Sequence, residues 1–172
     1  MRLFQLALML VVALLEINVG AQSRTYTKDG LDFVVELPSP EWRAVSRVDV
    51  HDHIDFIHTD DSTNGYLRFR KRVVAVDETA SDLFRYDQRW ELQALPGYVF
   101  CGECKPAEFQ GQLPGGVFSY EYTSRGKAMA GRIYYLQMDK HTFCILQFTV
   151  AREKYEGLLE QMDFIAGSVR IK

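Results

Sequence analysis

Eight short segments with the character of β-strands, interrupted by two amphipathic helical segments, constrain the fold of this chain more than any other feature. Four strands are predicted before the first helix and four between the helices, so the expected order is ββββ-α-ββββ-α. Strands joined by short turns pair antiparallel, and a one-sided helix buries its apolar side against a sheet. The sequence therefore predicts an α+β sandwich on one mainly antiparallel sheet with two main helices. A cone-shaped sheet that encloses a ligand pocket is the alternative.

The predicted strands are recognised by their β-rich composition and by apolar residues at alternate positions. They span residues 31–37, 42–50, 54–59, 66–74, 98–101, 117–123, 129–138 and 142–150. The third and fourth strands form a hairpin, for which Asn64-Gly65 is the turn signal. Alternation separates the apolar residues of the fourth strand from three arginines on its other face, Arg68, Arg70 and Arg72.

Two segments have the periodicity of amphipathic helices. The first begins after Thr79, a good N-cap residue, and carries Asp82 where the helix dipole favours a carboxylate. The apolar stripe predicted for it consists of Leu83, Tyr86, Trp90 and Ala94. Pro96-Gly97 ends this pattern, and the second helix is predicted at residues 153–168 with a wide apolar stripe. Both stripes are expected to pack on the sheet.

Residues 1–21 have the pattern of a secretory signal peptide. Arg2 supplies a basic start, residues 3–15 are apolar, and Val19-Gly20-Ala21 places small residues before the expected cleavage site. The apolar segment is shorter than the roughly 20 residues that span a membrane. We therefore expect an exported protein, periplasmic or secreted, with residues 22–172 as one domain and no transmembrane span after cleavage. An uncleaved membrane anchor is the alternative.

Composition and motifs exclude several classes of function. The formal net charge of −3 gives the chain no global attraction to nucleic acid or anionic lipid. The sequence contains neither a glycine-rich phosphate loop nor a G-x-S-x-G nucleophile motif. We therefore expect a non-enzymatic protein without a nucleic-acid partner, and without a cofactor other than the divalent metal considered below.

The beginning and the end of the mature chain resemble PsbP-like domains. The residues that carry the resemblance are Asp29-Gly30-Leu31-Asp32-Phe33, Leu37-Pro38, Trp42, the strand at 142–150, Ala151-Arg152-Glu153-Lys154-Tyr155, the helix that follows, and Ser168-Val169-Arg170. These domains include the photosystem extrinsic subunit and small exported bacterial proteins, and they share their fold with a nuclear Ran-binding family of the Mog type. The resemblance implies an α/β/α sandwich that binds or scaffolds an envelope protein or a small ligand, with no catalytic constellation.

The segment Cys101-Gly102-Glu103-Cys104 stands outside this resemblance. Positions i and i+3 lie about 10 Å apart in a strand, whereas a β-turn brings them within the roughly 7 Å that a disulfide needs. In an exported protein we expect a disulfide between Cys101 and Cys104, with Gly102 in the turn and Cys144 as a buried free thiol. A bridge from Cys144 to one of the pair, or a thiol–disulfide redox site at Cys101 and Cys104, are the alternatives.

A histidine-rich segment, residues 51–58, is also outside the resemblance. Alternation places His51, His53 and Asp55 on one side of the strand, and two imidazoles with a carboxylate can bind zinc or copper. The sequence therefore offers a metal-binding protein as an alternative function. The other interpretation is a solvated polar face on which Asp55 pairs with arginines across the hairpin.

The three alternating arginines offer one further site. Arg68, Arg70 and Arg72 concentrate positive charge on one strand face, which suits an anionic polymer or a lipid head group. A charged strand that resists edge-to-edge pairing with other chains is the structural alternative.

Overall fold

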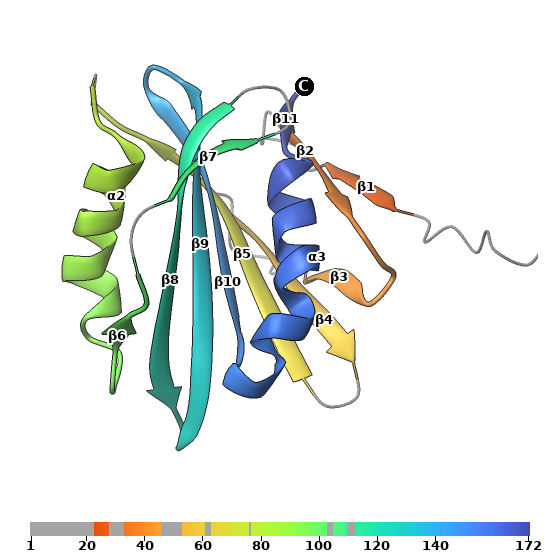
Figure 1. Cartoon of the computed structure of the whole chain (residues 1–172). Helices are drawn as coiled ribbons and strands as arrows, with labels where there is room; N and C mark the ends of the chain where they lie inside the picture. The colour runs from red at the N-terminus through yellow and green to blue at the C-terminus, as the bar shows by residue number, and fades with distance from the viewer. Residues whose placement is uncertain are drawn as a thin grey trace, which may run out of the picture.

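The computed structural model describes residues 23–27, 33–45, 53–60, 63–75, 77–102, 105–109 and 113–172. The predicted signal peptide, Met1–Ala21, lies outside the described residues, as do His51 and Cys104. In the described part, two helices lie on opposite sides of a large twisted sheet, and a small sheet stands beside the second helix (Figure 1).

The main sheet has eight strands in the order β3-β4-β5-β10-β9-β8-β6, with β7 pairing to β8 at the same edge as β6. Every pairing in it is antiparallel. Its strands are β3 (Trp42–Val45), β4 (His53–Asp60), β5 (Thr63–Val73), β6 (Val99–Phe100), β7 (Lys105–Phe109), β8 (Leu113–Ser124), β9 (Lys127–Asp139) and β10 (Thr142–Ala151).

The remaining elements form the layers on either side of this sheet. Helix α2 (Ala80–Asp87) continues as a π-helical turn, η1 (Gln88–Leu92), on one face. The 3₁₀ turn η2 (Arg152–Lys154) and helix α3 (Tyr155–Gly167) lie on the other face. A three-stranded sheet of β1 (Arg24–Thr27), β2 (Phe33–Leu37) and β11 (Arg170–Ile171) completes that side (Figure 1). The predicted α+β sandwich is confirmed.

Each face of the main sheet carries its own hydrophobic core. The core beneath α3 and the small sheet contains Trp42, Phe56, Phe148 and Met162 among its buried side chains. The core beneath α2 is built by Leu83, Phe84, Leu92, Phe118, Tyr120, Ile133, Tyr135, Phe143 and Ile145. Because β10 lies between β5 and β9, its alternate residues supply both cores, which places this strand at the centre of the fold.

The predicted hairpin of β4 and β5 is confirmed, but its turn lies earlier than Asn64-Gly65. Asp60 pairs with Thr63, so both Asn64 and Gly65 belong to β5. Gly65 is required for a different reason than turn geometry: it faces His58, and a Cβ on Gly65 would lie 2.9 Å from the Cβ of His58. The absence of a side chain at Gly65 therefore makes room for His58.

The start of α2 follows the prediction. Thr79 is the N-cap: its Oγ1 accepts a hydrogen bond from the backbone N–H of Asp82, while the Asp82 carboxylate accepts from the N–H of Thr79, which completes a capping box. Hydrogen bonds from Thr79 lower the pKa of Asp82, so the carboxylate stays charged at the positive end of the helix dipole.

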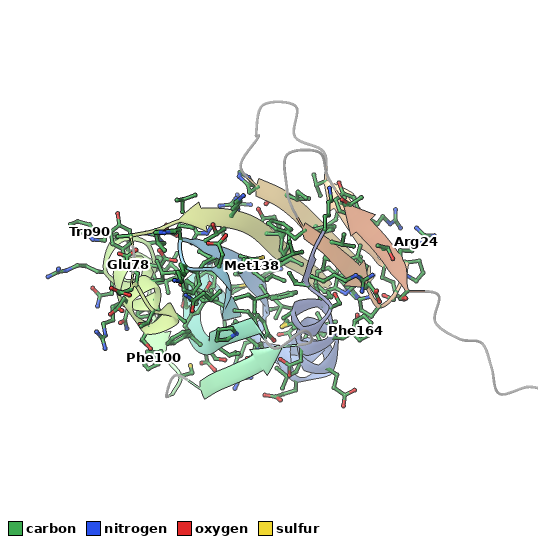
Figure 2. All side chains as sticks on the ribbon, turned by 90° about the horizontal axis from the view of Figure 1, so that it is seen from above. Arg24, Glu78, Trp90, Phe100, Met138 and Phe164 are labelled. Carbon is green, nitrogen blue, oxygen red and sulfur yellow. The ribbon has the colours of Figure 1, made fainter. Side chains whose placement is uncertain are left out.

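Of the four residues in the predicted apolar stripe of this helix, Leu83 is buried, and the prediction is wrong for Tyr86, Trp90 and Ala94. Tyr86 and Trp90 are 52% and 65% exposed, whereas Leu92 is buried. Tyr86 precedes the π turn and is exposed within α2 itself. For Trp90 and Leu92 the cause is the π turn, in which the N–H of Gln93 donates to the carbonyl of Gln88, five residues back. The extra residue in this turn rotates Leu92 toward the sheet and Trp90 away from it. Figure 2 places Trp90 on the outer side of the helix.

Candidate functional site

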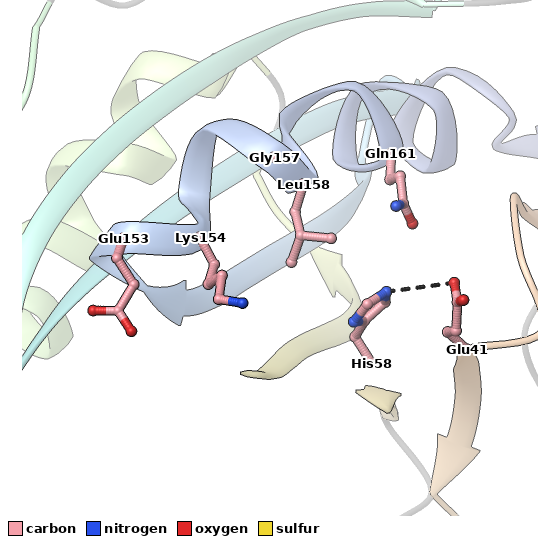
Figure 3. A pocket seen from close by; sticks show the side chains of 7 residues that line it. All are labelled: Glu41, His58, Glu153, Lys154, Gly157, Leu158 and Gln161. Atoms are coloured by element: carbon pink, nitrogen blue, oxygen red, sulfur yellow. Dashed lines mark ion pairs between the residues drawn. The ribbon is translucent and has the colours of Figure 1, made fainter. Parts of the chain in front are cut away.

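A cavity of about 330 Å³ opens where α3 begins, beside the edge formed by β3 and β4. Its lining residues are Glu41, His58, Glu153, Lys154, Gly157, Leu158 and Gln161. They come from three parts of the chain: the turn before β3, strand β4, and the segment η2–α3 (Figure 3). The cavity therefore lies at the seam where the last helix meets the edge of the main sheet.

His58 is the central residue of this cavity. It alternates in phase with Ile54 and Phe56 along β4. Its side chain therefore points to the face of the sheet that α3 covers, and it is only 4% exposed. Its ring packs 5.1 Å from the ring of Trp42, centroid to centroid. Sequence reasoning missed His58, although a histidine in phase with buried apolar residues was the available signal.

The imidazole of His58 has hydrogen-bonding capacity that the described residues do not use. Neither ring nitrogen makes a hydrogen bond within them. Nε2 lies 3.8 Å from Oε2 of Glu41, which is longer than a hydrogen bond (Figure 3). Buried polar groups are nearly always hydrogen-bonded, because an unpaired one loses its contact with water without compensation. A molecule in the cavity that bonded to the imidazole would remove this cost.

Gln161 is held in one orientation by a residue behind the cavity wall. The indole Nε1 of buried Trp42 donates to Oε1 of Gln161 at 2.9 Å. Because that bond occupies the carbonyl oxygen, the amide cannot flip without losing it, and the NH₂ group is the free end of the side chain. This contact also ties α3 to β3, across 119 residues of sequence.

Gly157 widens the cavity at the first turn of α3. A Cβ at this position would meet no other atom within 4 Å, so the glycine leaves open space rather than avoiding a clash. Leu158, which is buried, supplies the apolar part of the wall. The cavity thus combines one apolar surface with an imidazole, an amide, an ammonium and carboxylates.

The predicted metal ligands do not share a face with His58. His51 lies outside the described residues. His53 Nε2 is 3.7 Å from Oδ2 of Asp55, and Asp55 is buried and also pairs with Arg68, whose Nε lies 3.3 Å from Oδ1. In the described part of the chain, no group of three or more potential ligands is placed to hold a metal ion. Metal binding at His51, His53 and Asp55 stays a prediction.

The three arginines of β5 each contact a carboxylate of this chain. Arg68 pairs with Asp55, and its Nη2 also donates to Tyr66 at 2.9 Å. Arg70 Nη2 and Arg72 Nη1 both bond to Asp87 of α2, at 2.9 and 2.6 Å. The charge predicted to attract anions is therefore directed at buried carboxylates, and anion binding by this strand stays a prediction.

The cysteines are only partly described. Cys104 lies outside the described residues, so the disulfide from Cys101 to Cys104 stays a prediction. Gly102 has a φ of 122°, a value that suits glycine in a turn. Cys144 is a buried free thiol, as expected, and Cys101 is exposed and not bonded to it. Burial and the Glu121 carboxylate raise the pKa of Cys101, which is opposite to the shift that a reactive thiolate requires.

No family model matches the sequence, and no curated protein matches it. Solved structures do match over most of the chain. LpqN of Mycobacterium tuberculosis has a TM-score of 0.61 at 15% identity, covering 88% of this chain and 91% of LpqN. CyanoP, the PsbP of Synechocystis, has a TM-score of 0.61 at 10% identity, covering 91% of this chain and 96% of CyanoP. The Ran-binding protein Mog1p of Saccharomyces cerevisiae has a TM-score of 0.60 at 7% identity, covering 88% and 96%.

The fold is that of PsbP and Mog1. The expectation drawn from the residues at the two ends of the chain is thereby confirmed for the architecture. TM-scores of 0.60 to 0.61 at identities of 7 to 15% establish a shared fold alone. Function depends on the site that each protein carries on that fold. Within this PsbP/Mog1-like fold, the described part of the chain contains no helix long and apolar enough to cross a membrane.

Proposed function

We propose that this chain is a non-enzymatic binding domain, exported to the cell envelope, and that it holds a small ligand in the cavity around His58. The observation that carries the proposal is the imidazole of His58, a residue of the cavity wall, whose two buried nitrogens have no hydrogen-bonding partners among the described residues. Pockets that recognise ligands combine an apolar wall with a few fixed polar groups. Leu158, His58 and the anchored Gln161 fit that pattern.

The described lining residues do not form a nucleophile–base pair of the Ser-His or Cys-His kind. None of the described lining residues is a serine, threonine or cysteine, so the cavity supplies no hydroxyl or thiol that His58 could activate as a nucleophile. LpqN is described as involved in cell envelope biogenesis and Mog1p as Ran-binding. Those roles belong to those proteins. For this chain they support a binding or scaffold role, and the signal-peptide pattern of residues 1–21 supports export.

Native mass spectrometry of protein isolated from its own compartment tests this proposal. We expect a chain that begins at Gln22 and carries a small-molecule adduct. His58→Phe should remove the adduct, because the ring keeps its bulk but loses both nitrogens. His141→Phe is the matched control, since His141 is exposed and outside the cavity. An adduct that survives in His58→Phe, or wild-type protein that carries none, would contradict binding at this site.

A further inference from the structure

We propose that the ligand of the His58 cavity is a compact zwitterion, which carries an ammonium group and a carboxylate a few bonds apart, as amino acids and short peptides do. This inference rests on the proposed function of the cavity. It goes further by assigning the chemical class of the ligand from the placement of charge and hydrogen-bonding groups on the cavity wall.

The wall carries opposite charges on two sides of the imidazole. Lys154 reaches in from η2 on one side of His58, and Glu41 points to the cavity from the turn before β3 on the other side (Figure 3). The third charged lining residue, Glu153, directs its carboxylate away from His58 (Figure 3). Electrostatic complementarity sets which ligands a site accepts, because like charges brought together are strongly unfavourable. A ligand with one positive and one negative end can place its ammonium by Glu41 and its carboxylate by Lys154.

Hydrogen bonding leads to the same class of ligand. A neutral imidazole has one N–H donor and one acceptor nitrogen. A carboxylate accepts from the donor nitrogen and an ammonium donates to the other, so a zwitterion satisfies both nitrogens of His58 together. A dicarboxylate would leave the acceptor nitrogen unpaired and bring an anion to Glu41. A diamine would leave the donor unpaired and bring a cation to Lys154.

The amide of Gln161 adds a second donor for the carboxylate. The Trp42 indole donates to its carbonyl oxygen and so fixes the orientation of the amide, whose NH₂ group can donate to a ligand. The cavity volume of about 330 Å³ is at the small end of ligand pockets. The volume therefore suits a compact molecule.

Isothermal titration calorimetry with four defined probes tests the assignment. The probes are the dipeptide Ala-Ala as zwitterion, succinate as dianion, 1,4-diaminobutane as dication, and N-acetylalanine amide as a neutral compound. We expect Ala-Ala to bind at least about tenfold more tightly than each of the others, since hydrogen bonds to charged groups are of that strength. Equal or tighter binding of another probe, or binding of none, would overturn the zwitterion assignment.

Charge variants test the two ends separately. Glu41→Gln and Lys154→Gln should each weaken Ala-Ala binding by about tenfold. Glu160→Gln and Lys127→Gln, exposed residues outside the cavity, should leave binding unchanged. Glu41→Lys should reverse the preference in favour of succinate. Circular dichroism identifies any variant that has failed to fold.

The outcomes separate this inference from the proposed function. Binding of succinate or 1,4-diaminobutane that His58→Phe abolishes would overturn the zwitterion class while supporting the cavity as the binding site. Binding of Ala-Ala that His58→Phe leaves unchanged would overturn both. Binding of Ala-Ala that His58→Phe, Glu41→Gln and Lys154→Gln all weaken would support both.

Discussion

Replacing Asp87 with alanine is expected to lower the free energy of unfolding by about 3 kcal/mol, because a buried charge network would lose its centre. The Asp87 side chain is 1% exposed and accepts hydrogen bonds from Arg70 at 2.9 Å, Arg72 at 2.6 Å and the hydroxyl of Tyr135 at 2.8 Å. Burial and the Asp87 carboxylate raise the pKa of Tyr135 well above its ordinary value, so the phenol remains a donor. Without Asp87, all three donors would lose this partner.

Urea denaturation of the wild type and of Asp87→Ala measures this loss. Glu91→Ala is the matched control, because Glu91 pairs with Arg70 at 3.3 Å but its side chain is 46% exposed. An exposed pair of this kind contributes no more than about 1 kcal/mol. If the two variants destabilised the protein equally, Asp87 would have no special role in joining α2 to β5 and β9.

Replacing Gly131 with alanine is expected to cost about 1–3 kcal/mol, because the new methyl group would overlap a buried ring. Gly131 pairs with Tyr120 across β9 and β8, and a Cβ at Gly131 would lie 2.1 Å from the ring carbon Cζ of Tyr120. The ring is 1% exposed and its hydroxyl accepts a hydrogen bond from Gln147 at 3.0 Å. Tyr120 therefore cannot move aside without losing contacts.

Gly167→Ala is the matched control, since a Cβ at Gly167 at the end of α3 would meet nothing within 4 Å. Thermal or urea unfolding should separate the two glycine variants clearly. In a Tyr120→Val background, Gly131→Ala should leave the free energy of unfolding nearly unchanged, because the ring that the new methyl group would overlap is gone. A Gly131→Ala protein as stable as Gly167→Ala would refute the close packing of ring and backbone.

Local patterns predicted most of the architecture. The long strands β5, β9 and β10 have a β-rich composition, and the cap at Thr79 identified the start of α2. The strands that were missed, β1, β7 and β11, are short edge strands of four, five and two residues, whose pairing is decided by tertiary contacts. The outward position of Trp90 depends on a π turn, which no periodicity rule includes.

The candidate site was much less predictable. Sequence reasoning chose His51, His53 and Asp55 because they alternate together, whereas His58 lies on the opposite side of β4, which faces α3. The other lining residues, from Glu41 to Gln161, are distant in sequence and meet only when α3 packs on the sheet edge. A cavity formed by residues from distant parts of the chain has no local sequence pattern by which it could be predicted.

The Trp42–Gln161 contact and the exposed Trp90 also give the chain two distinguishable fluorophores. These are the only tryptophans in the sequence: Trp42 is 1% exposed and bonds to a residue lining the cavity, and Trp90 is 65% exposed. Iodide quenches an indole that reaches solvent and spares one that is enclosed. With Trp90→Phe, the emission of the protein would come from Trp42 alone, so filling of the cavity could be followed optically without any label.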